Sequence, residues 1–482
     1  MRKERIKTVI LTLLILNCLQ LTGQIWLNRK LWPSGYNFFN SVSNNPVVES
    51  ILRVFPFGKE SGTVDNGFIN IIRPQQIVIS SGNAREVYLP GGKQYSDAYK
   101  TVDSVMRRLL ESSTVRSSVI SAEEWQGYLK GKSIYIDYGI NMDSASLMAS
   151  FGAIRGTVLS GVGAVSDIMI TGDNVTKEGI VCIFDSASDT ITKYWVDFRG
   201  DELLKYIESA TFGKRQNKAF AFELGLDRPP AGAGTAIKRR ILLSPLVLLS
   251  MNSETMEKIS VSNPLEGAGG RFDSIVEAFG YTPSSLRKSV TEEGVASYVE
   301  NSATIRINTN GMVEYAAVET DKGILLQSGR IEPTSLINGI TRIAAEVWRA
   351  AGGEDFPDLC MASDLTESRD GEYIVKMNYS FNGIPVITPV TDEDFAQNAI
   401  YAQVQNGYLK RFKILLRSFE PIEESSAVMP GINALDSLAI KYKGAESVRI
   451  LDIFKCYNAG DETASVVWGV KISGENDTVL VD

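Results

Sequence analysis

The residues that could do chemistry here are acids, serines and a few cysteines, because the 482-residue chain contains no histidine. Without imidazole it has no Ser-His-Asp or Cys-His nucleophile pair and no histidine zinc ligand. Ser285 and Lys288 match Ser-x-x-Lys, but no Lys-Thr-Gly accompanies them, and a serine-rich chain gives such matches by chance. We therefore expect no serine–lysine nucleophile.

Motifs for phosphates, dinucleotides and metals are also incomplete. No P-loop is present, and Gly161 and Gly163 lack the third glycine of a dinucleotide fingerprint, which favours a simple turn. Asp185 with Asp189, and the acidic group at residues 392–394, lack the glycine and distal glutamate of a calcium loop, which favours solvated turns. The sequence predicts no catalytic, cofactor-binding or metal-binding residue. A carboxylate pair for glycoside hydrolysis stays open, since its separation is a structural quantity.

The N-terminus carries an apolar segment long enough to cross a membrane. Residues 8–27 contain no charge, and a helix of 20 residues spans about 30 Å. A cleaved signal peptide would have a shorter apolar region that ends in an A-x-A-like cleavage site, and the sequence Leu21-Thr22-Gly23-Gln24 lacks that spacing. We expect a transmembrane helix at 8–27 after a cytoplasmic tail at 1–7. The basic tail favours a single-pass protein of the cytoplasmic membrane, with the bulk of the chain extracytoplasmic.

One face of this predicted helix is polar. Asn17, Gln20 and Gln24 are spaced by three and four residues, so they share an arc of about 60°, and Leu13 lies on the same side. Amides that face lipid are costly, so this face is predicted to bind a partner helix. The alternative is that Gln24 lies at the head groups and Asn17 is tolerated alone.

Charge and cysteine usage restrict the extracytoplasmic part. Residues 31–482 hold 43 basic and 56 acidic side chains, a net charge of −13 that disfavours nucleic acid as a partner. Cys182, Cys360 and Cys456 lie in apolar surroundings and are odd in number, which indicates buried thiols. A Cys360–Cys456 disulfide stays open.

Hydrophobic periodicity predicts an α+β fold of helices packed on antiparallel sheets. A juxtamembrane stalk at 28–65 precedes an N-terminal α/β module at 66–255, in which the apolar run 241–251 is expected to be a buried strand. A middle helix-plus-hairpin module at 256–330 and C-terminal α+β modules at 331–482 follow. Their hairpin turns are expected at the Asn-Gly pairs 310–311, 382–383 and 406–407.

Loose patterns along the whole chain resemble the YycH family, accessory regulators of an essential two-component system in low-GC Gram-positive bacteria. These patterns are Gln24-Ile-Trp26, Arg73-Pro74-Gln75-Gln76-Ile77-Val78, Glu124-Trp125, Arg271-Phe272-Asp273, Gly294-Val-Ala-Ser-Tyr298, Asn382-Gly383-Ile384-Pro385-Val386 and Asn406-Gly407-Tyr408-Leu409. The resemblance implies a non-enzymatic, cofactor-free regulator of signal transduction in cell-wall metabolism. Its partners would be a sensor histidine kinase (YycG, or WalK) and a YycI-like sister protein. It also implies PepSY-like modules toward the C-terminus.

Two other functions stay open: an anchored extracytoplasmic cell-wall hydrolase, and a PepSY-like binder or inhibitor of a secreted peptidase. A hydrolase would place two carboxylates across a cleft, about 5–9.5 Å apart. A peptidase binder would show an apolar groove or an open sheet edge in the C-terminal modules. The sequence leaves open the sign of regulation, the signal and the oligomeric state.

Overall fold

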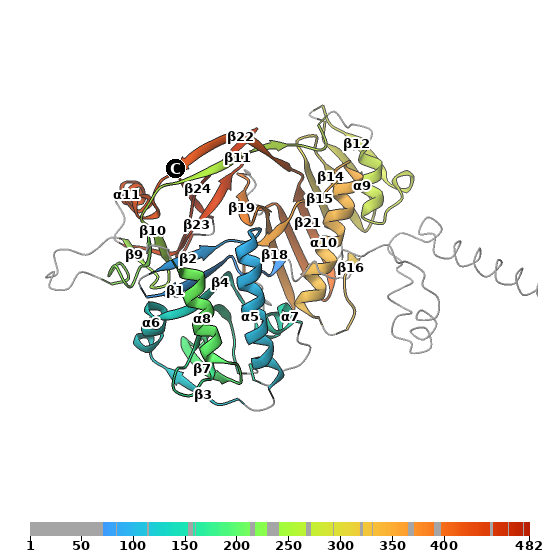
Figure 1. Cartoon of the computed structure of the whole chain (residues 1–482). Coiled ribbons are helices and arrows are strands. Elements are labelled where there is room, and N and C mark those ends of the chain that lie inside the picture. Colours follow the sequence, from blue (N-terminus) through green and yellow to red (C-terminus); the bar gives the residue numbers. More distant parts are fainter. Residues whose placement is uncertain are drawn as a thin grey trace, which may run out of the picture.

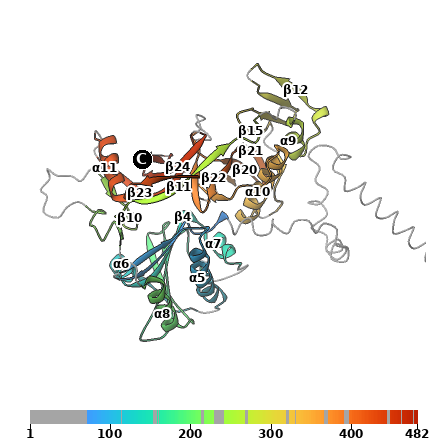
Figure 2. The same ribbon diagram turned by 45° about the horizontal axis from the view of Figure 1, so that its top comes forward.

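The structure is a computed structural model with an α+β fold. It describes residues 71–482 except residues 83, 113–114, 153–157, 160, 213–216, 229–240, 267–270, 293, 319–321, 330, 365–370, 390–396, 444–446, 461 and 476. A seven-stranded sheet with its helices lies against a broad, 16-stranded sheet, and Figure 2 shows the two as separate layers. The described part contains seven α-helices.

The first sheet is wholly antiparallel and has the order β2-β1-β4-β5-β6-β7-β3. Its strands are β1 (Gln76–Ser81), β2 (Arg85–Tyr88), β3 (Ser117–Ile120), β4 (Lys132–Met142), β5 (Val165–Gly172), β6 (Gly179–Asp185) and β7 (Thr190–Val196). Helices α5 (Lys93–Glu111) and α8 (Gly200–Thr211) pack against it on one face, and α6 (Ala122–Lys130) packs through Trp125 and Leu129 on the other. With α7 (Ser144–Ser150), these elements form what we call the seven-stranded unit (Figure 1).

The spacing of apolar residues explains why α5 forms and which face it buries. Tyr95, Ala98, Val102, Val105 and Leu109 recur at steps of three, four and seven, so they line one side of a helix. All five are at most 2% exposed. The apolar spacing therefore accounts both for the helix and for the face that it buries.

The large sheet follows the order β12-β13-β14-β15-β21-β20-β18-β19-β23-β24-β11-β22, with four short strands at its sides. Its strands are β9 (Ile241–Leu243), β11 (Glu254–Ser262), β12 (Arg287–Val290), β13 (Ala296–Val299), β14 (Ala303–Ile307), β15 (Met312–Ala317), β16 (Ile324–Leu325), β17 (Leu359–Met361), β18 (Glu372–Phe381), β19 (Ile384–Ile387), β20 (Ile400–Gln405), β21 (Tyr408–Leu415), β22 (Ser418–Val428), β23 (Val448–Asn458), β24 (Thr463–Ile472) and β25 (Val479–Val481). Helices α9 (Phe272–Ala278), α10 (Pro333–Ala350) and α11 (Gly431–Lys441) accompany it.

All three hairpins predicted at Asn-Gly pairs are present, joining β14 to β15, β18 to β19 and β20 to β21. At 382–383 and 406–407 both residues have positive φ, between 49° and 78°, as a two-residue hairpin turn with this twist requires. At 310–311 only the glycine does, with φ of 97°.

The single buried strand predicted at residues 241–251 is wrong. The run forms β9, which pairs with β23, and β10 (Leu248–Ser250), which pairs with β8 (Lys218–Phe220) in a separate two-stranded sheet. Pro245 lies between them and has no N–H for a sheet ladder, so the chain turns there.

The module boundaries at 255/256 and 330/331 stay predictions, and the large sheet runs across both. β15 pairs with β21, and β11 lies between β22 and β24. The predicted tail at 1–7, span at 8–27 and stalk at 28–65 lie outside the described residues. Among the residues that are described, no helix combines the length and apolar character needed to cross a membrane.

Candidate functional site

A cavity of about 770 Å³ lies where the seven-stranded unit meets the large sheet. Its walls come from the segment ahead of β1, the β2–α5 turn and the end of β4 on one side. On the other side they come from α10, β17, β18, β19, β23 and β24. We call it the junction cavity. Pockets of this size hold small ligands or short segments of another chain.

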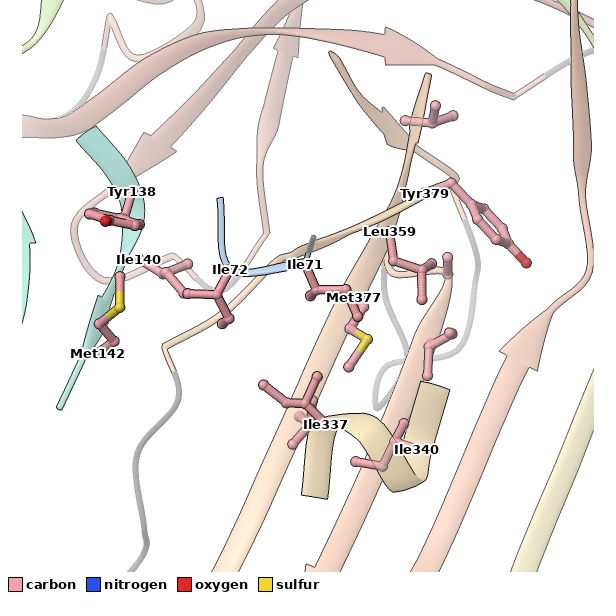
Figure 3. Close-up of a cluster of buried hydrophobic side chains, with 14 of the residues drawn as sticks. Ile71, Ile72, Tyr138, Ile140, Met142, Ile337, Ile340, Leu359, Met377 and Tyr379 are labelled. Atoms are coloured by element: carbon pink, nitrogen blue, oxygen red, sulfur yellow. The ribbon is translucent and has the colours of Figure 1, made fainter. Parts of the chain in front are cut away.

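Figure 3 shows the buried apolar cluster beside the junction cavity, of which Ile71, Ile72, Tyr138, Ile140 and Leu359 line the cavity. Ile71 and Ile72, 5% and 1% exposed, lie between the end of β4 and the strands of the large sheet. Tyr138, Ile140 and Met142 of β4 flank them on one side, with Leu359, Met377, Ile337 and Ile340 on the other. The described chain therefore begins inside the contact between the two layers.

Short polar contacts also join the layers. Lys471 Nζ on β24 donates to the carbonyl of Gly139 at 2.7 Å. The backbone and side-chain amides of Asn141 donate to Asp364 at 2.8 and 3.0 Å. These contacts couple the end of β4 to the large sheet.

Two turns meet at the cavity with no room for side chains. A Cβ atom on Gly383 would lie 1.9 Å from the carbonyl oxygen of Pro90, and one on Gly91 would lie 2.9 Å from the carbonyl carbon of Asn382. Both glycines have positive φ, so each is required by its backbone conformation and by the close approach. The Asn-Gly turn that closes β18–β19 is thus also a contact with the seven-stranded unit.

The charged side chains that line the cavity have both signs. Arg342 and Arg349 project from α10 seven residues apart, which places them on one helix face. Glu354, Asp355 and Asp358 follow in the loop ahead of β17. A mixed lining of this kind suits a zwitterionic or peptide ligand better than a simple anion.

Cys360 also lines the cavity, but it is not a nucleophile. Burial raises the pKa of its thiol to about 12, and Sγ lies 3.7 Å from the carbonyl oxygen of Asn378. A protonated thiol neither attacks a carbonyl nor binds a metal at neutral pH. Cys360 is therefore not a candidate nucleophile of this cavity.

A cluster of three acidic residues lies near the cavity without lining it: Asp137 on β4, Asp167 on β5 and Asp452 on β23. Burial first, and the charge of Asp137 second, raise the pKa of Asp167 to about 7 and that of Asp452 to about 6. Burial also raises the pKa of Asp137, against hydrogen bonds from Gln76 Nε2 at 2.9 Å and the Gly139 amide at 2.7 Å. One strand of the large sheet thus shares a proton-binding cluster with the seven-stranded unit.

The sequence motifs that we discounted have structural roles. Ser285 donates to Thr282, whereas Lys288 bonds Asp273 at 3.0 Å, so the two do not form a nucleophile pair. Asp185, predicted to be in a solvated turn, is in the β6–β7 hairpin but only 6% exposed. Burial opposes its ionisation, but hydrogen bonds from the Gly163, Ala164 and Ala187 amides and the Ser188 hydroxyl together lower its pKa.

The other predicted site residues are placed as follows. The partner-binding face of Leu13, Asn17, Gln20 and Gln24, like the acidic group at 392–394, lies outside the described residues. Cys182, Cys360 and Cys456 are free thiols, so the Cys360–Cys456 disulfide left open by the sequence is not formed. Among the described residues, no group of three or more Cys, Asp or Glu side chains could hold a metal ion.

Sequence reasoning missed the junction cavity and the acidic cluster. Both assemble from segments more than 200 residues apart, such as β4 with β17 or β23. The only local signal was the pair of turns, since Pro90-Gly91 and Asn382-Gly383 each require a glycine.

Comparisons with known proteins identify the fold. No protein-family model and no curated protein matches the sequence. The structure is similar to the crystal structure of YycH from Bacillus subtilis, with a TM-score of 0.56 and 14% sequence identity. The match covers 86% of this chain and 97% of that chain, so it includes both layers and the junction between them. The chain therefore has the YycH fold that its sequence patterns predicted.

Proposed function

We propose that this protein is a membrane-anchored, non-enzymatic regulator that modulates a sensor histidine kinase controlling cell-wall metabolism. It acts through transmembrane and ectodomain contacts, together with a YycI-like partner. The observation that carries the proposal is the fold match over 97% of the YycH chain. The uncharged segment at residues 8–27 adds the membrane anchor, with the N-terminus in the cytoplasm.

The position of Ile71 supports a role in signal transmission. Ile71 and Ile72, which begin the described part of the chain, are buried between the seven-stranded unit and the large sheet. A shift of one layer against the other therefore displaces Ile71 and Ile72, because packed cores transmit displacement.

The polar face of the predicted span is the proposed contact with the kinase or its sister protein. Each interhelical hydrogen bond of Asn17, Gln20 or Gln24 contributes only about 0.6 kcal/mol, so single changes are expected to be silent. Replacing all three by Leu keeps length and hydrophobicity. We expect the triple replacement to lower recovery of the kinase in membrane complexes and to change its output. Unchanged recovery and output would exclude these three amides as the interface.

The anchored hydrolase has less support. Asp137, Asp167 and Asp452 do not line the junction cavity, and Glu354, Asp355 and Asp358, which do line it, all come from the one segment between α10 and β17. The direct experiment is purification of the full chain from membranes after cross-linking in cells. We expect the kinase and the sister protein as stoichiometric partners. Peptidoglycan turnover that is lost when one Asp or Glu is replaced would overturn the proposal.

A further inference from the structure

Four charged side chains from four strands meet where the two layers touch. On the seven-stranded unit, Asp137 of β4 lies directly opposite Asp167 of β5 in the strand register. On the large sheet, Asp452 of β23 lies directly opposite Lys471 of β24. Side chains that are directly opposite in an antiparallel pair share one face of the sheet, with Cβ atoms about 4.5–5.5 Å apart. We call these four residues the junction quartet.

Two observations bring the two pairs together into one cluster. Lys471 Nζ donates to the carbonyl oxygen of Gly139, two residues beyond Asp137, at 2.7 Å. The charge of Asp137 acts on both Asp167 and Asp452, and the charge of Lys471 acts on Asp137 and Asp452. The two pairs therefore face each other across the contact between the layers, at which β4 lies (Figure 2).

The surroundings add no further charge to the quartet. Tyr135 on β4 donates to one of the carboxyl groups, and burial raises the pKa of its hydroxyl, which stays neutral. Gln76 and Phe184, the cross-strand neighbours on β1 and β6, carry no charge. The thiol of Cys360 near Lys471 is protonated. Three carboxyl groups thus share one ammonium group, so full ionisation leaves two uncompensated negative charges at the contact.

This arrangement makes the contact sensitive to protons. Like charges directly opposite each other destabilise an antiparallel pair, and an uncompensated charge at a half-buried contact costs more than a neutral acid. Burial first, and the charge of Asp137 second, accordingly raise the pKa of Asp452 to about 6 and that of Asp167 to about 7. Because the groups interact, their protons leave in steps that belong to the cluster. The contact is therefore most stable at acidic pH and weakens as the pH rises through this range.

We propose that the junction quartet is a pH-sensitive latch between the two layers. With protonated carboxyl groups it holds β4 of the seven-stranded unit against β23 and β24, and repulsion across the contact loosens it when the protons leave. Lys471 lines the junction cavity, and Ile71 and Ile72 are packed between the same two layers, so release of the latch changes the cavity and the packing of both isoleucines. The inference does not rest on the proposed kinase regulation.

The backbone amide of Asn141 reports the state of the latch, because it donates to Asp364 of the large sheet at 2.8 Å. Its hydrogen exchange is measured by mass spectrometry with peptide fragmentation, on the full chain in lipid nanodiscs between pH 5 and pH 9. Each rate is divided by the intrinsic exchange rate at that pH, and the amides of β6 in the seven-stranded sheet are the internal reference.

We expect the corrected exchange of the Asn141 amide to rise with pH at least tenfold more than that of the β6 amides, since a change of one pKa unit corresponds to a factor of ten. An equal rise at both places would show destabilisation of the whole fold without release of the layers. That result, or no rise at Asn141, would overturn the proposal.

Two carboxylate variants localise the effect. Asp137→Asn removes the charge that acts on both other acids while it keeps the size of the side chain, so the additional rise at Asn141 should fall below threefold. Asp103→Asn is the matched control, because Asp103 pairs with Arg107 on α5 at 2.7 Å and is not part of the quartet. This control should keep the wild-type rise. A folded Asp137→Asn protein with the wild-type rise would contradict the latch.

Lys471→Met is the second test position, chosen in case Asp137→Asn fails to fold. Without the ammonium group the carboxyl groups are harder to ionise, so the midpoint of the rise at Asn141 should move up by at least about one pH unit. Lys471→Arg keeps the charge and should keep the midpoint. A lysine with a purely structural role would give faster exchange at every pH and an unchanged midpoint, and that result would overturn the proposal.

Discussion

Replacing Asp167 by Asn is expected to stabilise the protein above neutral pH and to do so less as the pH falls. Asp167 accepts hydrogen bonds from Tyr135 and Ser166 and lies near Asp137 and Asp452. Burial, followed by the charge of Asp137, raises its pKa to about 7 from an ordinary value near 4. The folded protein therefore keeps a proton that the unfolded chain has released, and stability falls as the pH rises through this window.

The magnitude follows from the pKa difference. Three pKa units correspond to about 4 kcal/mol, which is the upper bound on the stability that ionisation of Asp167 removes by pH 8. The Asn amide accepts one hydroxyl hydrogen bond well but not two, a loss of about 1 kcal/mol. Proton sharing among the three carboxylates reduces the gain further. We therefore expect Asp167→Asn to raise the free energy of unfolding by about 1–2 kcal/mol at pH 8 and by almost nothing at pH 4.5.

The assay is urea unfolding of the full chain between pH 4.5 and pH 8. Asp185→Asn is the matched control, because hydrogen bonds lower the pKa of Asp185 and its ionised form stabilises the fold. That variant is expected to lose stability at pH 8, the opposite sign. Identical pH dependence of the wild type and Asp167→Asn would refute the assignment of Asp167 as the group that titrates near pH 7.

Three further predictions follow from the packing. Gly383→Ala places a Cβ 1.9 Å from the Pro90 carbonyl oxygen, so it should destabilise the contact between the layers and increase protease cleavage near this junction; wild-type cleavage would contradict that. Arg85→Met removes the fully buried guanidinium that pairs with the Glu223 carboxylate, so the free energy of unfolding, measured by thermal unfolding, should fall by about 3 kcal/mol. A decrease below about 1 kcal/mol would mean that the pair is dispensable. Residues 331–482 alone lack β11, which lies between β22 and β24, so this segment should not unfold cooperatively in urea; cooperative unfolding would show that β11 is not needed.

Local patterns were sufficient to predict the α+β class and the three Asn-Gly hairpins. The 3.6-residue periodicity of α5 and α10 and the Asn-Gly turns depend only on neighbouring residues, so they could be recognised directly. The split of residues 241–251 could not, because both halves are apolar and their partners, β23 and β8, lie elsewhere in the chain. Pro245 was the local signal for the turn.

The candidate site was less predictable than the fold because its parts come from distant segments. The insertion of β11 between β22 and β24 depends on pairing across about 160–200 residues, for which the sequence carries no local mark. The pairing of β17 with β18 is likewise invisible in Leu-Cys-Met, since any apolar triplet in a strand has the same pattern. The cysteines also show what a sequence leaves open. Their odd number and apolar neighbours favoured free thiols, but only the structure excluded the Cys360–Cys456 disulfide.

The central claim, that this chain regulates a sensor kinase, is tested most directly by reconstituting that kinase in lipid vesicles with its sister protein. Autophosphorylation is then measured with and without the full chain at equal stoichiometry. A variant in which an unrelated membrane helix replaces residues 8–27 separates tethering from recognition. We predict that the full chain changes the autophosphorylation rate and that the exchanged span loses at least part of this effect. An identical rate with and without the full chain, in vesicles where all three proteins are inserted and folded, would contradict the account.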